Sequence, residues 1–333
     1  KEEDVRQRMK EDLSYIRTYG KNKFYSGYSV ATKLWVGDYH YKTGCSFQDL
    51  ADCAQGIERI AVLRADVDNL GEAFVSGFAN EENHNRYVTL SRTSTFSRKL
   101  SLFFKYYINN LLEQGSFYLK EKEDKRRAAV IVYSGGDDLF VVGSWDDIIG
   151  FAVDLYYSLK KYSQGTLTIS GGIGIYPPKF PISVMAKQTG ALEDAAKEVD
   201  GKNAITLFDE RYSFHWSELI QEVIEEKVQL IQSYLDEFAA ERGKAFLYRV
   251  LELVRARWME KDGRINIARF AYQLSRVEPS EKASQEQKEL YRSFAKSMYR
   301  WIQNKEDSRQ LELTIYLYIY QTREKEGEYH GED

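Results

Sequence analysis

Residues 133–140 read Tyr-Ser-Gly-Gly-Asp-Asp-Leu-Phe, and they set two adjacent carboxylates, Asp137 and Asp138, between two strand-like runs. The run before them is AAVIVY (128–133) and the run after them is LFVVG (139–143). Both are apolar and rich in β-branched residues, as buried strands are. The pattern predicts a β-hairpin with Gly-Gly-Asp-Asp at its tip.

The tip itself admits two interpretations. Glycine adopts positive φ and permits close approach of a ligand, and aspartate supplies the hard oxygen ligands that Mg²⁺ prefers. The same dipeptides are ordinary turn formers, so the tip alone supports a plain turn and a metal site about equally.

A second acidic cluster favours the metal site. Residues 60–65, IAVLRA, form a predicted strand that leads into Asp66-Val67-Asp68-Asn69, and residues 70–78 then have a helical pattern. An acidic strand end plus an acidic hairpin is the minimum set for a two-metal site, in which cations about 4 Å apart hold the attacking and leaving oxygens. The two clusters together therefore indicate metal-phosphate chemistry.

Composition sets limits on the class of protein. The 333 residues, 43% of them hydrophobic, provide for two domains and a sizeable core. No run approaches the length of a membrane span and no signal run is present, so we expect no membrane contact and a cytoplasmic protein. Cys45 and Cys53 form no CxxC motif, and the four histidines are scattered, so we expect reduced thiols and no structural zinc.

Charge gives no general sign of nucleic-acid binding, because the net charge is −4. Two local charged stretches stand out, a basic cluster of Arg86, Arg92, Arg98 and Lys99, and a mixed charged loop at 120–127, KEKEDKRR. A solvated surface is the favoured interpretation of both runs.

The predicted fold class is α+β. Residues 1–55 are interpreted as a linker helix (2–19) and a connecting segment, with a strand at 33–41 and a short helix after a capping motif at Ser46. Residues 56–212 alternate strands and helices around the hairpin, which predicts a ferredoxin-like βαββαβ sheet with helices on one face. Residues 213–323 have only helical periodicity and predict an all-α helical bundle, and residues 324–333 are a flexible tail.

Four segments carry a family resemblance: GYSVATKLWVGDYHY (27–41), GIERIAVLRADVDNLGEAFVSGF (56–78), YSGGDDLFVVG (133–143), and the helical tail with RFAY (269–272). With ISGGIGIY (169–176), the acidic motifs resemble the palm of nucleotide cyclases with a GGDEF-type signature. In this order, the segments more closely resemble the large subunit of type III CRISPR effector complexes, in the Csm or type III-A branch. The resemblance covers most of the chain.

The resemblance implies an enzyme that joins ATP into 3′-5′ cyclic oligoadenylates and releases pyrophosphate when the guide RNA of its complex pairs with target RNA. It implies two Mg²⁺ or Mn²⁺ ions at the GGDD palm and no covalent nucleophile. It also implies other Csm subunits as partners, with small subunits at the C-terminal helical domain and guide and target RNA held through the complex.

Site residues follow from the same resemblance. Asp66 and Asp137 would be metal ligands, with the backbone carbonyl of Val67 as a third contact, and Asp138 would hold the second metal or help to deprotonate the attacking 3′ hydroxyl. Six further residues would bind the nucleotide: Ser134, Gly135, Gly136, Asn69, Lys197 and Lys202.

Some of these assignments leave alternatives open. Lys197 and Lys202 are spaced one residue further apart than the GGDEF pattern has them, and favourable cations at a helix end are the alternative to a phosphate-binding role. Asn69 would contact the first Asp or the ribose, or would only cap the next helix. Glycines 171, 172 and 174 in a predicted strand indicate a bulge or a close backbone approach, for which a nearby nucleotide is one reason.

Departures from the family narrow the prediction. The FKxxND and RxxD motifs of diguanylate cyclases are absent, which favours adenine over guanine. The sequence has no adjacent His-Asp dyad, no second GGDD-like palm and no cysteine zinc module, so we interpret it as the C-terminal portion of such a subunit, presenting half of a composite site. Two alternatives stay open: an independent dinucleotide cyclase, and a catalytically silent RNA-binding scaffold. The intact carboxylates oppose the scaffold, because clustered charges without metal repel one another.

Overall fold

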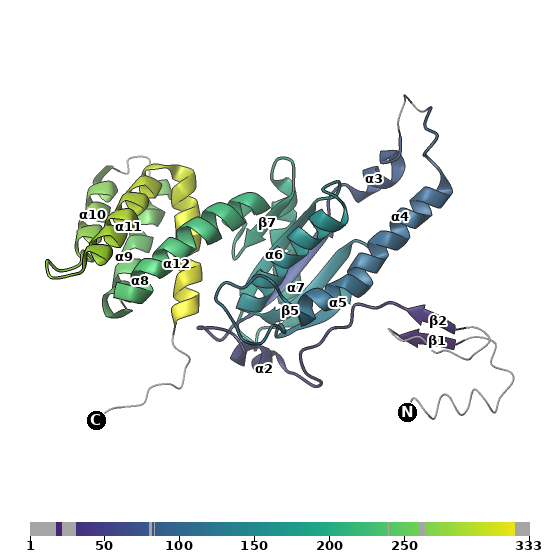
Figure 1. The fold of residues 1–333 in the computed structure, drawn as a ribbon, viewed down its shortest axis with the longest axis horizontal. Helices are drawn as coiled ribbons and strands as arrows, with labels where there is room; N and C mark the ends of the chain where they lie inside the picture. Colours follow the sequence, from purple (N-terminus) through teal and green to yellow (C-terminus); the bar gives the residue numbers. More distant parts are fainter. Residues whose placement is uncertain are drawn as a thin grey trace.

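The computed structural model describes residues 18–21, 31–79, 82, 84–238, 240–259 and 264–323. Within them, a mixed β-sheet with packed helices is followed by a bundle of helices, so the predicted α+β palm with an all-α domain is confirmed (Figure 1). The predicted helix at 2–19 and the predicted tail at 324–333 fall outside the described residues, except that Thr18 and Tyr19 lie in strand β1.

The central sheet has six strands among the described residues, in the spatial order β4-β5-β3-β6-β7-β8. Their bounds are β3 Ile60–Val67, β4 Ala129–Ser134, β5 Asp138–Ser144, β6 Ile169–Tyr176, β7 Ala204–Leu207 and β8 Ser213–His215. Strand β3 lies in the middle and pairs antiparallel with both β5 and β6, while β6 and β7 are parallel. Strands β4 and β5 form the predicted hairpin.

Helices cover both faces of this sheet, so the expectation of helices on one face is wrong. The palm helices are α2 Phe47–Asp52, α3 Leu70–Ser76, α4 Leu90–Leu102, η2 Phe103–Tyr107, α5 Ile108–Glu113, α6 Trp145–Tyr162, α7 Ile182–Glu198 and η3 Glu210–Tyr212. Leu63 of β3 packs in one core with α6, whereas its neighbour Val62 packs on the opposite face with Leu50 of α2 and Met185 of α7. Alternate residues of a strand point to opposite faces, so β3 serves two cores.

The close packing of α7 explains Gly172, one of the three glycines in the predicted strand. A Cβ at Gly172 would lie 2.5 Å from the backbone nitrogen of Glu193 and 2.6 Å from Cβ of Leu192. Glycine is therefore required where α7 meets β6, and no nucleotide is needed to account for it.

The predicted strand at 33–41 is also wrong. Strand β2 (Ala31–Leu34) pairs in parallel with β1 (Thr18–Lys21) and ends before Trp35, and beyond it only His40 forms an isolated bridge, to Val130. Asn109 explains this end: its amide donates to Val36 O at 3.0 Å and its oxygen accepts from the backbone of residues 38 and 39. A side chain thus replaces a neighbouring strand.

The C-terminal helices form a second core around Val250, Phe294 and Trp301. The helices are η4 Glu218–Val228, α8 Gln229–Phe238, α9 Ala240–Met259, α10 Arg264–Ser275, α11 Gln285–Gln303 and α12 Lys305–Thr322. The short strand β8 adds to the sheet beyond Tyr212, which corrects the expectation that only helices follow that residue.

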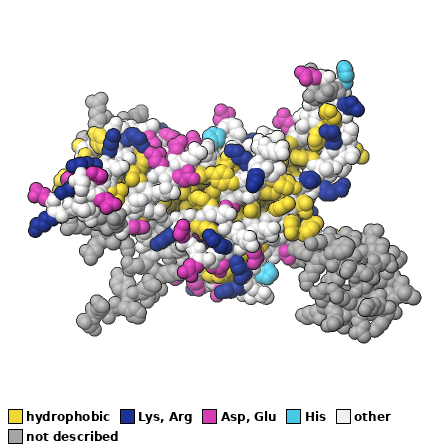
Figure 2. Space-filling view, viewed as in Figure 1, with side chains coloured by type: hydrophobic (Ala, Val, Ile, Leu, Met, Phe, Trp, Pro, Cys, Tyr) yellow, Lys and Arg dark blue, Asp and Glu magenta, His cyan; other side chains and the backbone are white. Residues whose placement is uncertain are grey.

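Helices α3 and α4 project from the end of the molecule opposite to the helical bundle (Figure 1). They and the segment between them carry exposed Arg86, Arg92, Arg98 and Lys99, and Figure 2 shows basic side chains on this arm. None of the helices in the described ranges combines the length and the apolar character that crossing a bilayer requires.

Candidate active site

The two acidic motifs meet at the paired ends of β3 and β5. Asp66 and Asp138 are partners in the antiparallel register, so their side chains lie on the same face of the sheet, the face that α7 covers. A cleft of about 560 Å³ opens at this point. Its lining comprises Arg64, Ala65, Asp66, Tyr133, Asp137, Asp138, Leu139, Phe140 and Glu193.

Asp137 joins this pair through the hairpin tip. Its backbone oxygen accepts a hydrogen bond from Val67 N at 3.2 Å, which holds the tip against the end of β3. Partial burial raises the pKa of the Asp137 carboxyl, the negative charges of Asp66 and Asp138 raise it further, and Lys197 opposes them. The three carboxylates predicted as metal ligands therefore form one cluster of mutually repelling charges.

The tip glycines do not use the conformational freedom expected of them. Neither Gly135 nor Gly136, both of which the structure describes, has a positive φ. Gly135 instead leaves room for two neighbouring side chains, because a Cβ there would lie 2.2 Å from the Tyr133 hydroxyl and 2.7 Å from Oδ1 of Asp138, and both groups would have to move. The charge of Asp138 and its hydrogen bond raise the pKa of that tyrosine.

Ser134 is engaged away from the cleft. Its hydroxyl donates to the backbone oxygen of Phe104 in η2. Ser134, which the family resemblance assigned to nucleotide binding, thus attaches the tip end of β4 to the helix beside it.

Lys197 comes from α7 and reaches the acidic cluster. Its Nζ lies 2.8 Å from Oδ2 of Asp66 and 2.8 Å from Oε1 of Glu193, and Glu193 also pairs with Nε of Arg64 at 3.2 Å. Although partial burial lowers the pKa of Lys197, the hydrogen bonds to Asp66 and Glu193 raise it to about 12. The lysine is therefore positively charged at neutral pH.

Arg64 and Glu193 were missed by the sequence reasoning, and simple periodicity signals both. Arg64 precedes Asp66 by two residues and so shares its face of β3, and Glu193 precedes Lys197 by one helical turn.

Lys202 lies at a different part of the site. Its Nζ donates to Oδ1 of Asn69 at 2.6 Å, and Asn203 N donates to Oδ2 of Asp68 at 3.1 Å. Asn69 stands at the N-cap position of α3 with a left-handed φ of 51°, but its side chain makes no capping hydrogen bond and accepts from Lys202 instead, so the interpretation of this residue as a side-chain cap is wrong. Lys202 belongs to the loop after α7, not to a helix end.

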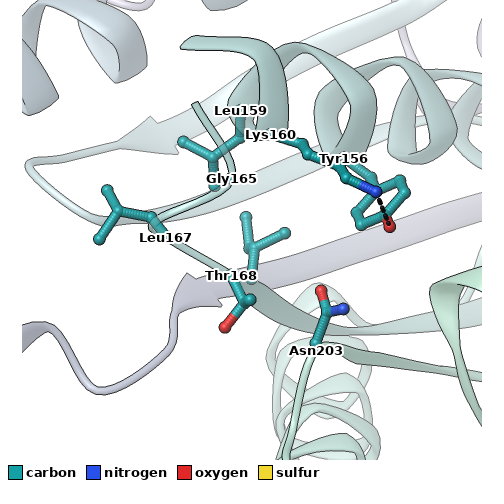
Figure 3. A pocket seen from close by; sticks show the side chains of 8 residues that line it. Tyr156, Leu159, Lys160, Gly165, Leu167, Thr168 and Asn203 are labelled. Atoms are coloured by element: carbon teal, nitrogen blue, oxygen red, sulfur yellow. Dashed lines mark hydrogen bonds between the residues drawn. The ribbon is translucent and has the colours of Figure 1, made fainter. Parts of the chain in front are cut away.

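A smaller pocket of about 110 Å³ lies beside the C-terminal half of α6 (Figure 3). It is lined by Tyr156, Leu159, Lys160, Gly165, Leu167, Thr168, Ile169 and Asn203. Lys160 donates to the Tyr156 hydroxyl at 3.4 Å within it, as Figure 3 shows. The pocket has no acidic lining residue, so the larger cleft is the better candidate for metal-phosphate chemistry.

The donor set of the larger cleft suits Mg²⁺ or Mn²⁺, because all three groups are carboxylate oxygens. Among the described residues, no group of three or more His, Cys, Asp or Glu side chains is arranged to hold a metal unaided. Mg²⁺ is ordinarily bound by one or two carboxylates together with substrate phosphates, so a phosphorylated substrate would have to complete the coordination.

The sheet order, the hairpin and the acidic cleft define a palm-type domain, and comparison with known proteins gives its family. Residues 59–206 match the model of the second palm domain of Cas10/Cmr2, and residues 232–324 match the second helical domain of the Cmr2 subunit of the CRISPR RNA silencing complex. The chain is 45% identical over 315 residues to the CRISPR system single-strand-specific deoxyribonuclease Cas10/Csm1 (subtype III-A) of Mycobacterium tuberculosis.

Solved structures that match this chain come from the same family. A Csm1–Csm4 cassette in complex with one ATP is 26% identical, with a TM-score of 0.62 over 90% of this chain and 43% of that chain. The cassette in complex with cA3 is 25% identical, with a TM-score of 0.63 over 91% of this chain and 43% of that chain. The chain belongs to the Cas10/Csm1 family of type III-A CRISPR systems. It spans 37% of the length of the mycobacterial relative, so the activity of a whole subunit does not transfer with the family.

Proposed function

We propose that this chain is the catalytic palm of a type III-A interference complex, which converts ATP to cyclic oligoadenylate and releases pyrophosphate when guide RNA holds target RNA. One observation carries the proposal: Asp66, Asp137 and Asp138 cluster at a cleft of about 560 Å³ that Arg64 also lines. Negative groups for metal beside a positive group for phosphate are what nucleotidyl transfer requires.

The residues have separate roles in this proposal. Asp66 and Asp137 would hold the metal ions with the Val67 carbonyl, and Asp138 would hold the second ion or accept the proton of the attacking 3′ hydroxyl. Mg²⁺ or Mn²⁺, when bound, would supply neutralising charge for the α-phosphate and the departing pyrophosphate. The protein itself mainly aligns the reactants, since phosphoryl chemistry needs no covalent nucleophile.

The substrate-binding groups surround the carboxylates. Lys197 and Lys202 would neutralise the triphosphate, and both already contact residues of the first acidic motif, Asp66 and Asn69. Gly135 and Gly136 keep the hairpin tip free of side chains that would obstruct a nucleotide. The hydroxyl of Ser134 would take part only after leaving Phe104.

Related complexes support adenine nucleotides as substrate and product. One of the similar Csm1–Csm4 cassettes is in complex with one ATP and another with cA3, and the matching part of each has the fold of this chain. We accordingly propose Csm subunits as partners, with small subunits at the C-terminal helical domain and guide and target RNA held through the complex. A first palm of the same polypeptide, which would also carry an HD domain, would complete the composite site.

Product analysis tests the proposal against its alternatives. The chain, assembled with its partner subunits and target RNA, would be incubated with ATP or GTP and Mg²⁺ or Mn²⁺, and the products would be separated and weighed by mass spectrometry. We expect 3′-5′ cyclic oligoadenylate from ATP, and only with target RNA. A cyclic dinucleotide made without RNA would indicate an independent cyclase, and RNA binding without any nucleotide product would indicate a scaffold.

A further inference from the structure

A continuous row of ion pairs runs along the wall of the cleft. Arg64 Nε lies 3.2 Å from Oε2 of Glu193, Glu193 Oε1 lies 2.8 Å from Nζ of Lys197, and the same Nζ lies 2.8 Å from Oδ2 of Asp66. The charges alternate along this row. Its last member is the carboxylate proposed as a metal ligand, so the row connects α7 to the metal site.

Glu193 is the fixed member of the row. Its side chain is only 8% exposed, while those of Lys197 and Arg64 are 29% and 40% exposed. Its backbone packs against Gly172 of β6, at a position where no other residue would fit. The carboxylate is therefore held in place by helix packing on one side and by a guanidinium on the other.

Arg64 is itself held by α7. Its Nη1 donates to the carbonyl of Ala186 at 3.4 Å, and a Cβ at Gly190 would lie 2.8 Å from that nitrogen. The missing side chain at position 190 leaves room for the guanidinium between the helix and the sheet. Glu193 is thus fixed by helix packing and by a positioned arginine, in addition to its ion pair with Lys197.

We propose that Glu193 is a positioning residue, which holds Lys197 beside Asp66 as a counter-ion and retains it when a divalent cation takes the Asp66 oxygen, leaving the ammonium available for a substrate phosphate. The inference rests on the proposed function, because it assumes a metal at Asp66. Lys197 keeps Glu193 as a carboxylate partner in both states, so the exchange does not leave its charge unpaired. The metal, in turn, enters a cluster whose repulsion Lys197 no longer needs to balance.

Two substitutions should move metal affinity in opposite directions. Lys197→Met removes the cation that competes for Asp66, and we expect Mn²⁺ to bind about fivefold more tightly, the effect of one partly exposed ion pair. Glu193→Gln leaves Asp66 as the remaining carboxylate partner of Lys197 within the row, and we expect Mn²⁺ to bind about threefold more weakly. In the double variant the effect of Glu193→Gln should largely disappear, because it acts through Lys197.

The measurement is a titration of the 333-residue chain with Mn²⁺ alone, followed by the electron paramagnetic resonance signal of the free ion. Lys187→Met and Asp194→Asn are matched controls, since they make the same charge changes at exposed positions of α7 and should leave the affinity within about twofold. If Glu193→Gln does not fold, Glu193→Asp replaces it, with the weaker binding again expected.

Different results would contradict the proposed function and the proposed roles of Lys197 and Glu193. Asp137→Asn should remove the bound Mn²⁺, and if wild type binds none that this substitution removes, the metal centre fails and the proposed function fails with it. If the site binds Mn²⁺ but Lys197→Met behaves like Lys187→Met, the counter-ion role is overturned and the metal centre stands. Additive effects in the double variant would overturn the positioning role of Glu193.

Discussion

At the scale of single residues, Asp137 carries the least favourable charge of the site. Burial and two neighbouring carboxylates raise the pKa of its side chain, and only Lys197 among the named causes opposes them. Such a group destabilises the metal-free fold once it is ionised, since ionisation costs more in the folded chain than in the unfolded one. Residues that lower the stability of the unliganded fold are characteristic of sites that bind a ligand.

Asp137→Asn should therefore stabilise the metal-free chain at neutral pH by about 0.5 kcal/mol, a value reduced for solvent screening at this partly exposed site. Below the ordinary pKa of an aspartate both states hold the proton and the gain vanishes. As the pH rises toward the raised pKa, Asp137 loses its proton in the unfolded chain before it does so in the folded one, and the stability of the wild type falls. The stability of Asp137→Asn relative to the wild type therefore increases. Urea unfolding in EDTA at acidic and neutral pH measures this difference in stability, with the exposed Asp194→Asn as the control. An Asp137→Asn variant whose stability at neutral pH is unchanged or lower would contradict the prediction.

At the scale of elements, helix α7 sets the geometry of the site through its contact with β6. Gly172→Ala should destabilise the chain by about 1–3 kcal/mol, because the new methyl group meets the backbone of α7. Gly71→Ala in α3 meets no atom within 4 Å and should instead be neutral or stabilising by up to about 1 kcal/mol. Chemical denaturation of both variants tests the pair, and equal effects would show that α7 is not packed as described.

Sequence periodicity predicted most of these elements but not how they pack. The strands at Asp66 and at the hairpin can be predicted because their apolar runs end at charged turns. The helix after Ser46 can be predicted because its capping box lies within the local sequence. The strand at 33–41 failed because Asn109, about seventy residues away, takes its backbone hydrogen bonds. The prediction of helices on one face of the sheet also failed because it depends on contacts between distant segments. The glycines that allow α7 to pack closely on β6 can be recognised as such only when the two elements are known to be adjacent.

The site was predictable to the same extent. Asp66, Asp137 and Asp138 stand at strand ends, where alternation and register fix their direction, and they do meet at one cleft. The partners of Lys197 and Lys202 are set by the packing of α7 and the loop after it, which the local sequence does not encode.

At the scale of the whole molecule, the palm and the helical bundle are not separable pieces. Leu313 and Leu317 of α12 and Leu219 of η4 are buried in the palm core, while other residues of α12 belong to the core of the bundle. A chain ending near Tyr212 would therefore expose palm core and lose its fold, so such a truncation does not isolate the docking role of the helices.

Leu317→Ala should destabilise the chain by about 2–5 kcal/mol, the cost of a cavity in a close-packed core. Leu90→Ala, at an 83% exposed position of α4, should cost less than about 0.5 kcal/mol. Thermal unfolding followed by circular dichroism distinguishes them, and a small effect at Leu317 would mean that α12 contributes little to the palm.

The central claim is that the clustered carboxylates drive ATP polymerisation, and pyrophosphate release by the assembled complex tests it most directly. With target RNA, ATP and Mg²⁺ present, we expect Asp137→Ala with Asp138→Ala to reduce pyrophosphate release by at least about 10³-fold, since the lost groups stabilise transition-state charge. RNA binding and subunit assembly should be unchanged, because both residues lie at the cleft and outside the buried core. Undiminished pyrophosphate release from the correctly assembled double variant would contradict the account.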